Sequence, residues 1–204
     1  MKVKVPDTAL MNIGISGKYF KCSLADMKNK AARRICRTYT QNYYKVRHKG
    51  YGLVVFGDEN GERNNAFYGV LKALFAQKQK VKVVSLGDIV SAYFDDKAML
   101  HEYCTVDVLG ITEMGVPEEA VNKGGKVSVL DLFRKRADHS KAVIVASCLE
   151  IEHPAQCVDM MFPGMGSLLA LNTVLVNVSN RTDCVWLRTG HSVTVKAIEG
   201  DTHA

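Results

Sequence analysis

Short apolar runs and longer amphipathic segments alternate along the chain. The apolar runs are continuous, which is typical of strands buried on both faces, and they occupy 53–56, 81–86, 106–111, 143–146 and 174–178. Between them, apolar residues recur every three or four positions, which predicts helices over 24–47, 66–79, 87–103 and 127–137. Strands that alternate with helices form βαβ units. We therefore expect one three-layer α/β domain with a mainly parallel sheet and helices on both faces.

The first predicted helix, which extends over 24–47, has two different faces. Its apolar stripe consists of Met27, Ala31, Ile35, Tyr39, Tyr43 and Val46. Off that stripe lie five basic residues, the candidates for DNA binding: Lys28, Lys30, Arg33, Arg34 and Arg37. Ser23 or Asp26 would cap the N-terminus of this helix. One face is thus expected in the core and the other in solvent.

The positive charge of the chain is concentrated in one segment. The net charge is +6, yet residues 18–49 hold ten Lys or Arg against one acid, so this segment carries +9. The remaining 17 basic and 20 acidic residues give about −3. Such a patch suits nucleic acid or another polyanion. The alternative is a basic helix face that is simply solvated.

Composition bears on the cellular compartment of the protein and on whether it binds metal. No apolar run among the 204 residues is long enough to span a bilayer, and the first eight residues contain no long apolar segment of a secretory signal. We therefore expect a cytoplasmic protein. Its six cysteines, at positions 22, 36, 104, 148, 157 and 184, include no C-x-x-C pair, which predicts free thiols and no metal site.

The loop after the first strand occupies the position of a phosphate-binding loop. A working loop reads G-x-x-x-x-G-K-[ST], in which the lysine reaches the phosphates and the hydroxyl holds Mg²⁺. Here Gly57 fits, but Glu62 replaces the second glycine, Arg63 the lysine and Asn64 the hydroxyl residue. The carboxylates of this loop, on Asp58, Glu59 and Glu62, would oppose a polyphosphate, at ~1–4 kcal/mol for each close pair of like charges.

The third strand ends where a P-loop ATPase requires acidic residues. Such enzymes hold Mg²⁺ with an acid at this point, whereas this chain has Thr112 followed by Glu113. Glu113 remains as a candidate base, although both residues are also explained as the end of a strand. The remnants of a nucleotide site would then be Gly57, Gly61, Arg63, Asn64, Thr112 and Glu113.

Five segments in order resemble the AAA+ domain of bacterial helicase loaders of the DnaC and DnaI kind and of IstB, the transposition helper. The segments cover roughly residues 20–180 and are 21–24, 52–57 with the following loop, 86–92, 106–115 and 144–149. Leu86-Gly87-Asp88-Ile89-Val90-Ser91-Ala92 is especially similar to the DnaC version of its segment. The resemblance implies a P-loop AAA+-like domain over 21–185, after an N-terminal lead, 1–20, and before a C-terminal tail, 186–204.

The chain departs from that family in one direction. The sensor strand of the family ends in Thr-Ser-Asn, and here Ala146, Ser147 and Cys148 stand there. Leu168 occupies the position of the arginine finger, a residue worth ~10³–10⁵ in rate where it acts. The family also carries an extra N-terminal module that grips the helicase, which about 20 leading residues are too few to form. These losses predict a degenerate member that is not an enzyme and uses neither ATP nor Mg²⁺ as cofactor.

The resemblance implies a role in DNA replication. The leading hypothesis is a non-catalytic adaptor, encoded by a phage or mobile element, that binds a DnaB-type replicative helicase, its loader or single-stranded DNA. It would recruit, load or inhibit the helicase. Tyr39, Tyr43 or Tyr44 would stack on bases if exposed, with core packing as the alternative.

Three other hypotheses remain open at the level of the sequence. The chain could be a weak ATPase in which Arg63 replaces lysine and Glu113 is the base. It could be an IstB-like transposition helper that acts on duplex DNA. It could also join a host loader's ring as an inert subunit, which the loss of the finger at Leu168 would suit.

Overall fold

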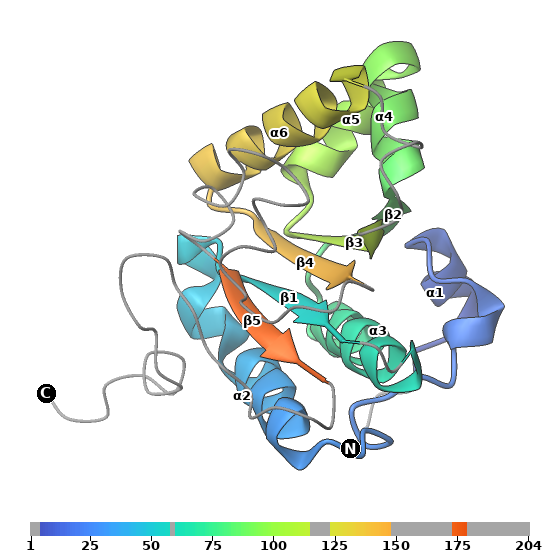
Figure 1. The fold of residues 1–204 in the computed structure, drawn as a ribbon, viewed down its shortest axis with the longest axis vertical. Helices are drawn as coiled ribbons and strands as arrows, with labels where there is room; N and C mark the ends of the chain where they lie inside the picture. The colour runs from blue at the N-terminus through green and yellow to red at the C-terminus, as the bar shows by residue number, and fades with distance from the viewer. Residues whose placement is uncertain (1–4, 58–59, 115–122, 148–172, 179–204) are drawn as a thin grey trace, which may run out of the picture.

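The computed structural model describes residues 5–57, 60–114, 123–147 and 173–178, and these form a three-layer α/β sandwich (Figure 1). Five parallel strands make the middle layer in the order β2-β3-β4-β1-β5. Their bounds are β1 Gly52–Phe56, β2 Val81–Ser85, β3 Val108–Met114, β4 Ala142–Ser147 and β5 Thr173–Asn177. The predicted fold class is confirmed.

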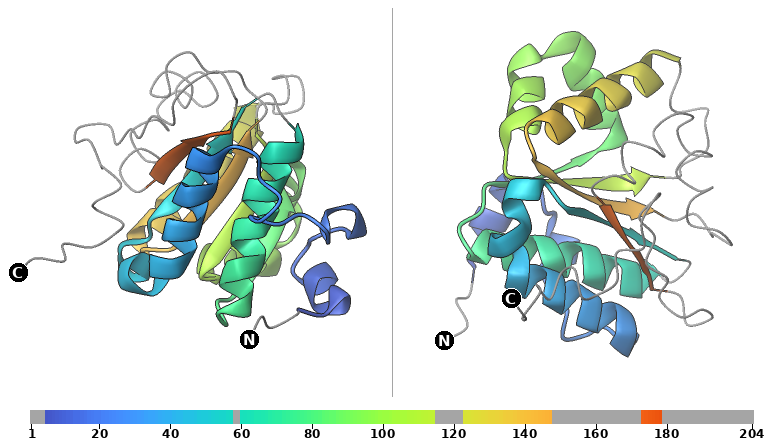
Figure 2. Two further views of the ribbon diagram at one scale, coloured as in Figure 1. Left: turned by 90° about the horizontal axis from the view of Figure 1, so that it is seen from below. Right: turned by 90° about the vertical axis from the view of Figure 1, so that its left-hand side faces the viewer.

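Helices cover both faces of this sheet (Figure 2). One face carries α1 (Asp7–Asn12), α2 (Lys30–Val46) and α3 (Asn60–Ala76). The other carries α4 (Leu86–Asp95), α5 (Lys97–Thr105) and α6 (Lys123–Asp138). Each side has its own apolar core, because the strands bury side chains on both of their faces. None of the described helices is long and apolar enough to cross a membrane.

The first basic helix begins six residues later than predicted. Residues 23–29 are not helical, and α2 starts at Lys30 because the side chain of Asn29 accepts a hydrogen bond from the backbone of Ala32 at 3.0 Å. Asn29 is therefore the N-cap, whereas Ser23 and Asp26 bond to each other at 2.8 Å. Lys28 lies outside the helix as a consequence.

Two other helix boundaries also differ from the prediction. α3 begins at Asn60 rather than at residue 66. The single helix expected over 87–103 is two helices, because Asp96 leaves the helical conformation and its carboxylate caps α5 through the backbone of Ala98 and Met99. The predicted C-terminal tail, 186–204, lies outside the described residues.

Residues 5–20, part of the N-terminal lead that the family resemblance implies, pack on the rest of the domain. Leu10, Ile13 and Ile15 are buried in the core beneath α3. The carbonyl of Ile13 accepts a hydrogen bond of 2.7 Å from the backbone of Val83 on β2, at the edge of the sheet. Gly14 allows this approach, since it has a φ of +92° and a Cβ there would meet the Val83 carbonyl oxygen at 2.2 Å.

Candidate functional site

The loop after β1 is shorter than a working phosphate-binding loop. Gly57 ends the strand with a φ of +137°, a conformation that favours glycine. Asn60 and Gly61, which would be loop residues in the G-x-x-x-x-G pattern, already belong to the first turn of α3. Asp58 and Glu59 lie outside the described residues. The described residues just before the arginine at the lysine position, Asn60 to Glu62, are therefore helical.

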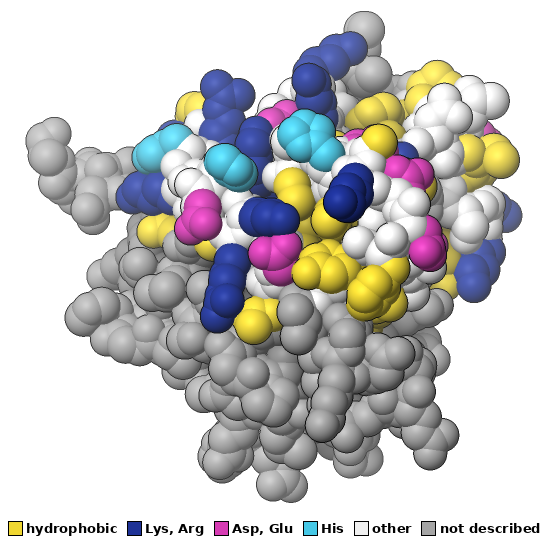
Figure 3. Space-filling model, turned by 90° about the horizontal axis from the view of Figure 1, so that it is seen from above, with side chains coloured by type: hydrophobic (Ala, Val, Ile, Leu, Met, Phe, Trp, Pro, Cys, Tyr) yellow, Lys and Arg dark blue, Asp and Glu magenta, His cyan; other side chains and the backbone are white. Residues whose placement is uncertain are grey.

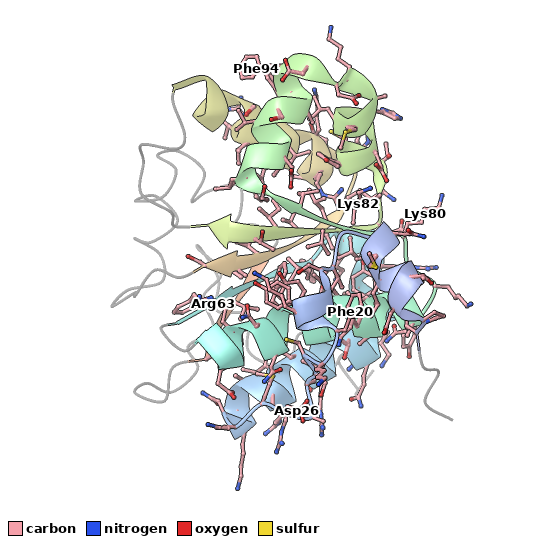
Figure 4. All side chains as sticks on the ribbon, turned by 90° about the vertical axis from the view of Figure 1, so that its right-hand side faces the viewer. Phe20, Asp26, Arg63, Lys80, Lys82 and Phe94 are labelled. Atoms are coloured by element: carbon pink, nitrogen blue, oxygen red, sulfur yellow. The ribbon has the colours of Figure 1, made fainter. Side chains whose placement is uncertain are left out.

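Arg63, at the position of the P-loop lysine, is turned into the protein. Figure 4 shows it on α3 near the carboxyl ends of the strands. Its side chain is 9% exposed, and its guanidinium donates a hydrogen bond to the carbonyl of Gly57. A contact of this kind joins the start of α3 to the end of β1. The cation that should reach a phosphate is thus bonded to the loop itself.

Glu62 does not face a phosphate site, which corrects the prediction made for its carboxylate. The side chain is 4% exposed and points toward the start of α2. Its oxygens accept backbone hydrogen bonds from Lys28, at 2.8 and 2.9 Å, and from Asn29, at 3.1 Å. An anion at a helix N-terminus is stabilised by the free backbone N–H groups and by the helix dipole. Glu62 therefore anchors the basic helix to α3.

The segment before α2 is held on α3 by further polar contacts. Asn65 accepts a hydrogen bond of 3.2 Å from the backbone of Ser23. The Lys72 ammonium donates one of 2.9 Å to the carbonyl of Phe20, a residue that Figure 4 labels beside α3. Burial lowers the pKa of Lys72, and the nearby Cys22 and Asp26 oppose that shift. Together with Glu62, these contacts fix where α2 begins.

A cavity of about 510 Å³ lies at the carboxyl ends of β2, β3 and β4. It brings together three of the predicted site residues, Arg63, Asn64 and Thr112. Gly57 and Gly61 do not line it, and the side chain of Glu113 lies outside the described part of the chain. Ligands of open α/β sheets bind outside the carboxyl ends of the strands, and this volume is in the range of small-molecule sites.

The polar residues of this cavity that the sequence pattern does not assign to a site include Lys18, Tyr19, Ser85 and Asp88. Lys18 and Tyr19 belong to the N-terminal segment. The Tyr19 ring stacks on Tyr68 of α3 with centroids 4.0 Å apart. Ser85 and Asp88 form a capping box at the start of α4, with hydrogen bonds of 2.7 to 3.1 Å. The Ser-x-x-Asp spacing signals this cap in the sequence, whereas nothing local signals the arrival of residues 18 and 19.

Thr112 stands where a metal-holding acid is expected, at the carboxyl end of β3. Its hydroxyl donates to the carbonyl of Val84 across the β2–β3 pair at 3.4 Å. A neutral hydroxyl with this role supplies no negative charge to Mg²⁺. Ser147 closes β4 and is fully buried, while Cys148 and Leu168, at the sensor and finger positions, lie outside the described residues.

The five predicted DNA-binding residues differ in their exposure and in whether they belong to α2. Lys30, Arg34 and Arg37 are exposed on α2. Arg33 is half-buried, and its guanidinium donates to the carbonyls of Ala25 and Met27 at 3.5 and 3.4 Å. Lys28 is exposed but precedes the helix. A shallow groove of about 300 Å³ is lined by Lys30, Arg33, Arg34, Arg37, Thr38 and Gln41.

The structure also separates the three tyrosines of α2. Tyr39 and Tyr43 are each 1% exposed, and burial raises the pKa of Tyr43 to about 12, with the nearby Asp107 adding to that rise. Their hydroxyls donate to the carbonyls of Tyr51 and Asp107, at 2.6 and 3.4 Å. Tyr44 is 62% exposed. Of the three candidates for base stacking, only Tyr44 offers its ring to solvent.

No protein-family model and no curated protein matches the sequence. Solved structures do match. The crystal structure of the DnaC helicase loader aligns with a TM-score of 0.69 at 15% sequence identity, over 80% of this chain and 100% of that chain. The crystal structure of DnaI aligns with a TM-score of 0.60 at 12% identity, over 82% of this chain and 93% of that chain.

This chain has the AAA+ fold of the helicase loaders. The replication initiator DnaA, solved with AMPPCP and single-stranded DNA, has the same fold with a TM-score of 0.59 at 15% identity, over 80% of this chain and 50% of that chain. The chain therefore spans all of the DnaC structure but half of the DnaA structure. The expected resemblance to the DnaC and DnaI type of AAA+ domain is confirmed at the level of the fold.

Proposed function

We propose that this AAA+ domain is a non-catalytic DNA-replication adaptor that resembles a helicase loader. It binds a DnaB-type replicative helicase or its loader, together with single-stranded DNA, and recruits, loads or inhibits the helicase without an ATP cycle. Support for the replication context comes from the matched structures, which include a helicase loader and an initiator bound to single-stranded DNA.

The contacts of Arg63 and Glu62 carry the non-catalytic part of the proposal. Arg63 is bonded to the Gly57 carbonyl, and Glu62 is bonded to the backbone at the start of α2. A phosphate that recruited Arg63 would leave a buried carbonyl without that donor, at a cost of about 1–3 kcal/mol. Thr112 gives Mg²⁺ no charge to bind. These contacts disfavour the binding of a nucleotide phosphate at this loop.

A second candidate, a weak ATPase with a variant loop, is favoured by one observation. Arg63, Asn64 and Thr112 all line the cavity of about 510 Å³, so a ligand there would meet the positions that bind nucleotide in the family. In this alternative Arg63 leaves Gly57 for the phosphates and Glu113 acts as the base.

A nucleotide titration separates the two candidates. We expect no change in the anisotropy of a fluorescent ATP analogue with Mg²⁺ up to near-millimolar protein, whereas a functional DnaC-type loader binds in the same assay. An Arg63→Ala variant serves as the matched control. Micromolar binding by the unchanged protein that Arg63→Ala abolishes would establish the nucleotide-binding candidate instead. Capture of the purified helicase by the unchanged protein tests the adaptor role separately.

A further inference from the structure

The outward side of α2 carries one continuous line of polar side chains. Five exposed residues recur at intervals of four, three, four and three positions, which places them on one face of a helix: Lys30, Arg34, Arg37, Gln41 and Tyr44. We call this line the α2 track. At 1.5 Å per residue it extends for about 21 Å. The buried residues of α2, from Ala32 to Val46, lie on the opposite side of the helix.

The charge on this helix has one sign. No residue of α2 is acidic, and the groove of about 300 Å³ along its first half is lined by four cations with Thr38 and Gln41. The distant face over α4 to α6 differs, because there Lys and Arg are interspersed with acids, histidines and hydrophobic side chains (Figure 3). On that face Lys135 pairs with Asp131 at 2.7 Å. A polyanion therefore complements the cationic part of the α2 track, from Lys30 to Arg37.

The last residue of the track indicates which polyanion it fits. The Tyr44 ring is 62% exposed, and the Lys45 ammonium lies 5.8 Å from its centroid. Proteins that bind single strands combine a cationic groove with aromatic rings on which bases stack. A duplex keeps the faces of its bases stacked inside, so an exposed ring next to a cationic groove suits a single strand better.

We propose that the α2 track is a binding site for single-stranded DNA, in which Lys30, Arg34 and Arg37 contact successive phosphates and Tyr44 stacks on a base. This site rests on the proposed adaptor function and makes it specific. It differs from the predicted set of basic residues, since Lys28 precedes the helix and Arg33 turns back to Ala25 and Met27. Glu62 positions the track by holding the backbone just before its first residue.

Anisotropy of a labelled 20-nucleotide oligo(dT) tests the track. A triple variant, Lys30→Gln, Arg34→Gln and Arg37→Gln, should weaken binding and reduce the slope of log K against log salt by about 2, because each phosphate contact on a single strand contributes about 0.7. Tyr44→Ala should weaken binding ~5- to 100-fold. Tyr44→Phe, which keeps an aromatic ring, should bind as the unchanged protein does. The matched control neutralises three exposed cations elsewhere, Lys78→Gln, Lys97→Gln and Arg134→Gln, and should retain the slope.

Three results would contradict the proposal that the α2 track binds single-stranded DNA. Equal losses in the triple variant and the matched control would mean that net charge alone attracts DNA. Tighter binding to a duplex of the same length, with no effect of Tyr44→Ala, would assign the face to duplex DNA. Loss of helicase capture in the triple variant, without any DNA binding by the unchanged protein, would make it a protein-docking face. If the unchanged protein captures the helicase while the track fails, the adaptor function stands without this site.

Discussion

One buried arginine joins separate segments of this domain through hydrogen bonds to backbone carbonyls. Arg136 of α6 is fully buried, and burial lowers its pKa to about 10. Its guanidinium donates to the carbonyls of Tyr103 at 2.5 Å, Ala142 at 2.6 Å and Asp107 at 3.4 Å. These carbonyls belong to α5, to β4 and to the residue just before β3, so one cation joins three segments at the amino ends of the strands.

Replacing Arg136 should therefore destabilise the fold without touching the candidate site. Arg136→Met keeps the bulk but leaves up to three buried carbonyls without this donor, and we expect a loss of about 2–4 kcal/mol in the free energy of unfolding. Urea denaturation measures the change. The neighbouring Arg134→Met, at an exposed position of the same helix, should change stability by less than about 0.5 kcal/mol. Equal midpoints for the two variants would contradict a bracing role.

At the scale of elements, apolar runs locate the strands and polar contacts between segments locate the helix ends. β1, β2, β4 and β5 each lie within one residue of their predicted bounds, because a strand buried on both faces must be apolar throughout. The starts of α2 and α3 were each misplaced by six residues. The first is set by Asn29 and by Glu62, which is 34 positions away from Lys28 in sequence.

In the candidate site too, position along the sequence predicts some residues, and contacts between distant segments determine the others. Arg63, Asn64 and Thr112 were predicted from their positions after two strands, and the cavity does bring them together. The destination of the Glu62 carboxylate could not be predicted, since it depends on how α2 packs against α3. Lys18 and Tyr19 could not be predicted either, because their place in the cavity depends on the docking of residues 5–20 at the edge of β2.

Neutralising Glu62 should loosen the start of α2. Glu62→Gln removes the anion at this helix terminus and turns one acceptor into a donor that faces backbone N–H groups, so we expect a loss of about 1.5–3 kcal/mol. Hydrogen exchange should show the protection of the Lys28 and Asn29 amides falling more than that of the strand amides. Glu102→Gln makes the same chemical change at a surface ion pair with Lys82 and should cost less than about 1 kcal/mol. Unchanged exchange at residues 28 and 29 would contradict the anchor.

At the scale of the whole molecule, the described residues form one unit that includes the N-terminal segment. The core on the α2 and α3 side contains Leu10, Ile13 and Ile15 as well as helix and strand residues. Because Val83 of the edge strand also bonds to the Ile13 carbonyl, this segment covers part of the edge of the sheet. An exposed edge strand is a template for unwanted pairing, so the segment protects the sheet while it lines the cavity with Lys18 and Tyr19.

Substitution of Ile15 tests whether the N-terminal segment, residues 5–20, unfolds together with the rest of the domain. Its side chain is completely buried, and large-to-small substitutions in cores cost about 2–5 kcal/mol when the surroundings cannot collapse. We expect Ile15→Ala to lower the free energy of unfolding by that amount within a single cooperative transition, followed by circular dichroism. Met11→Ala, at a side chain that is 62% exposed, should leave the transition in place. A separate early transition in Ile15→Ala, with the main midpoint unchanged, would mean that the segment detaches from an otherwise intact domain. The cavity beside α3 would then lose the wall that Lys18 and Tyr19 form each time the segment detaches.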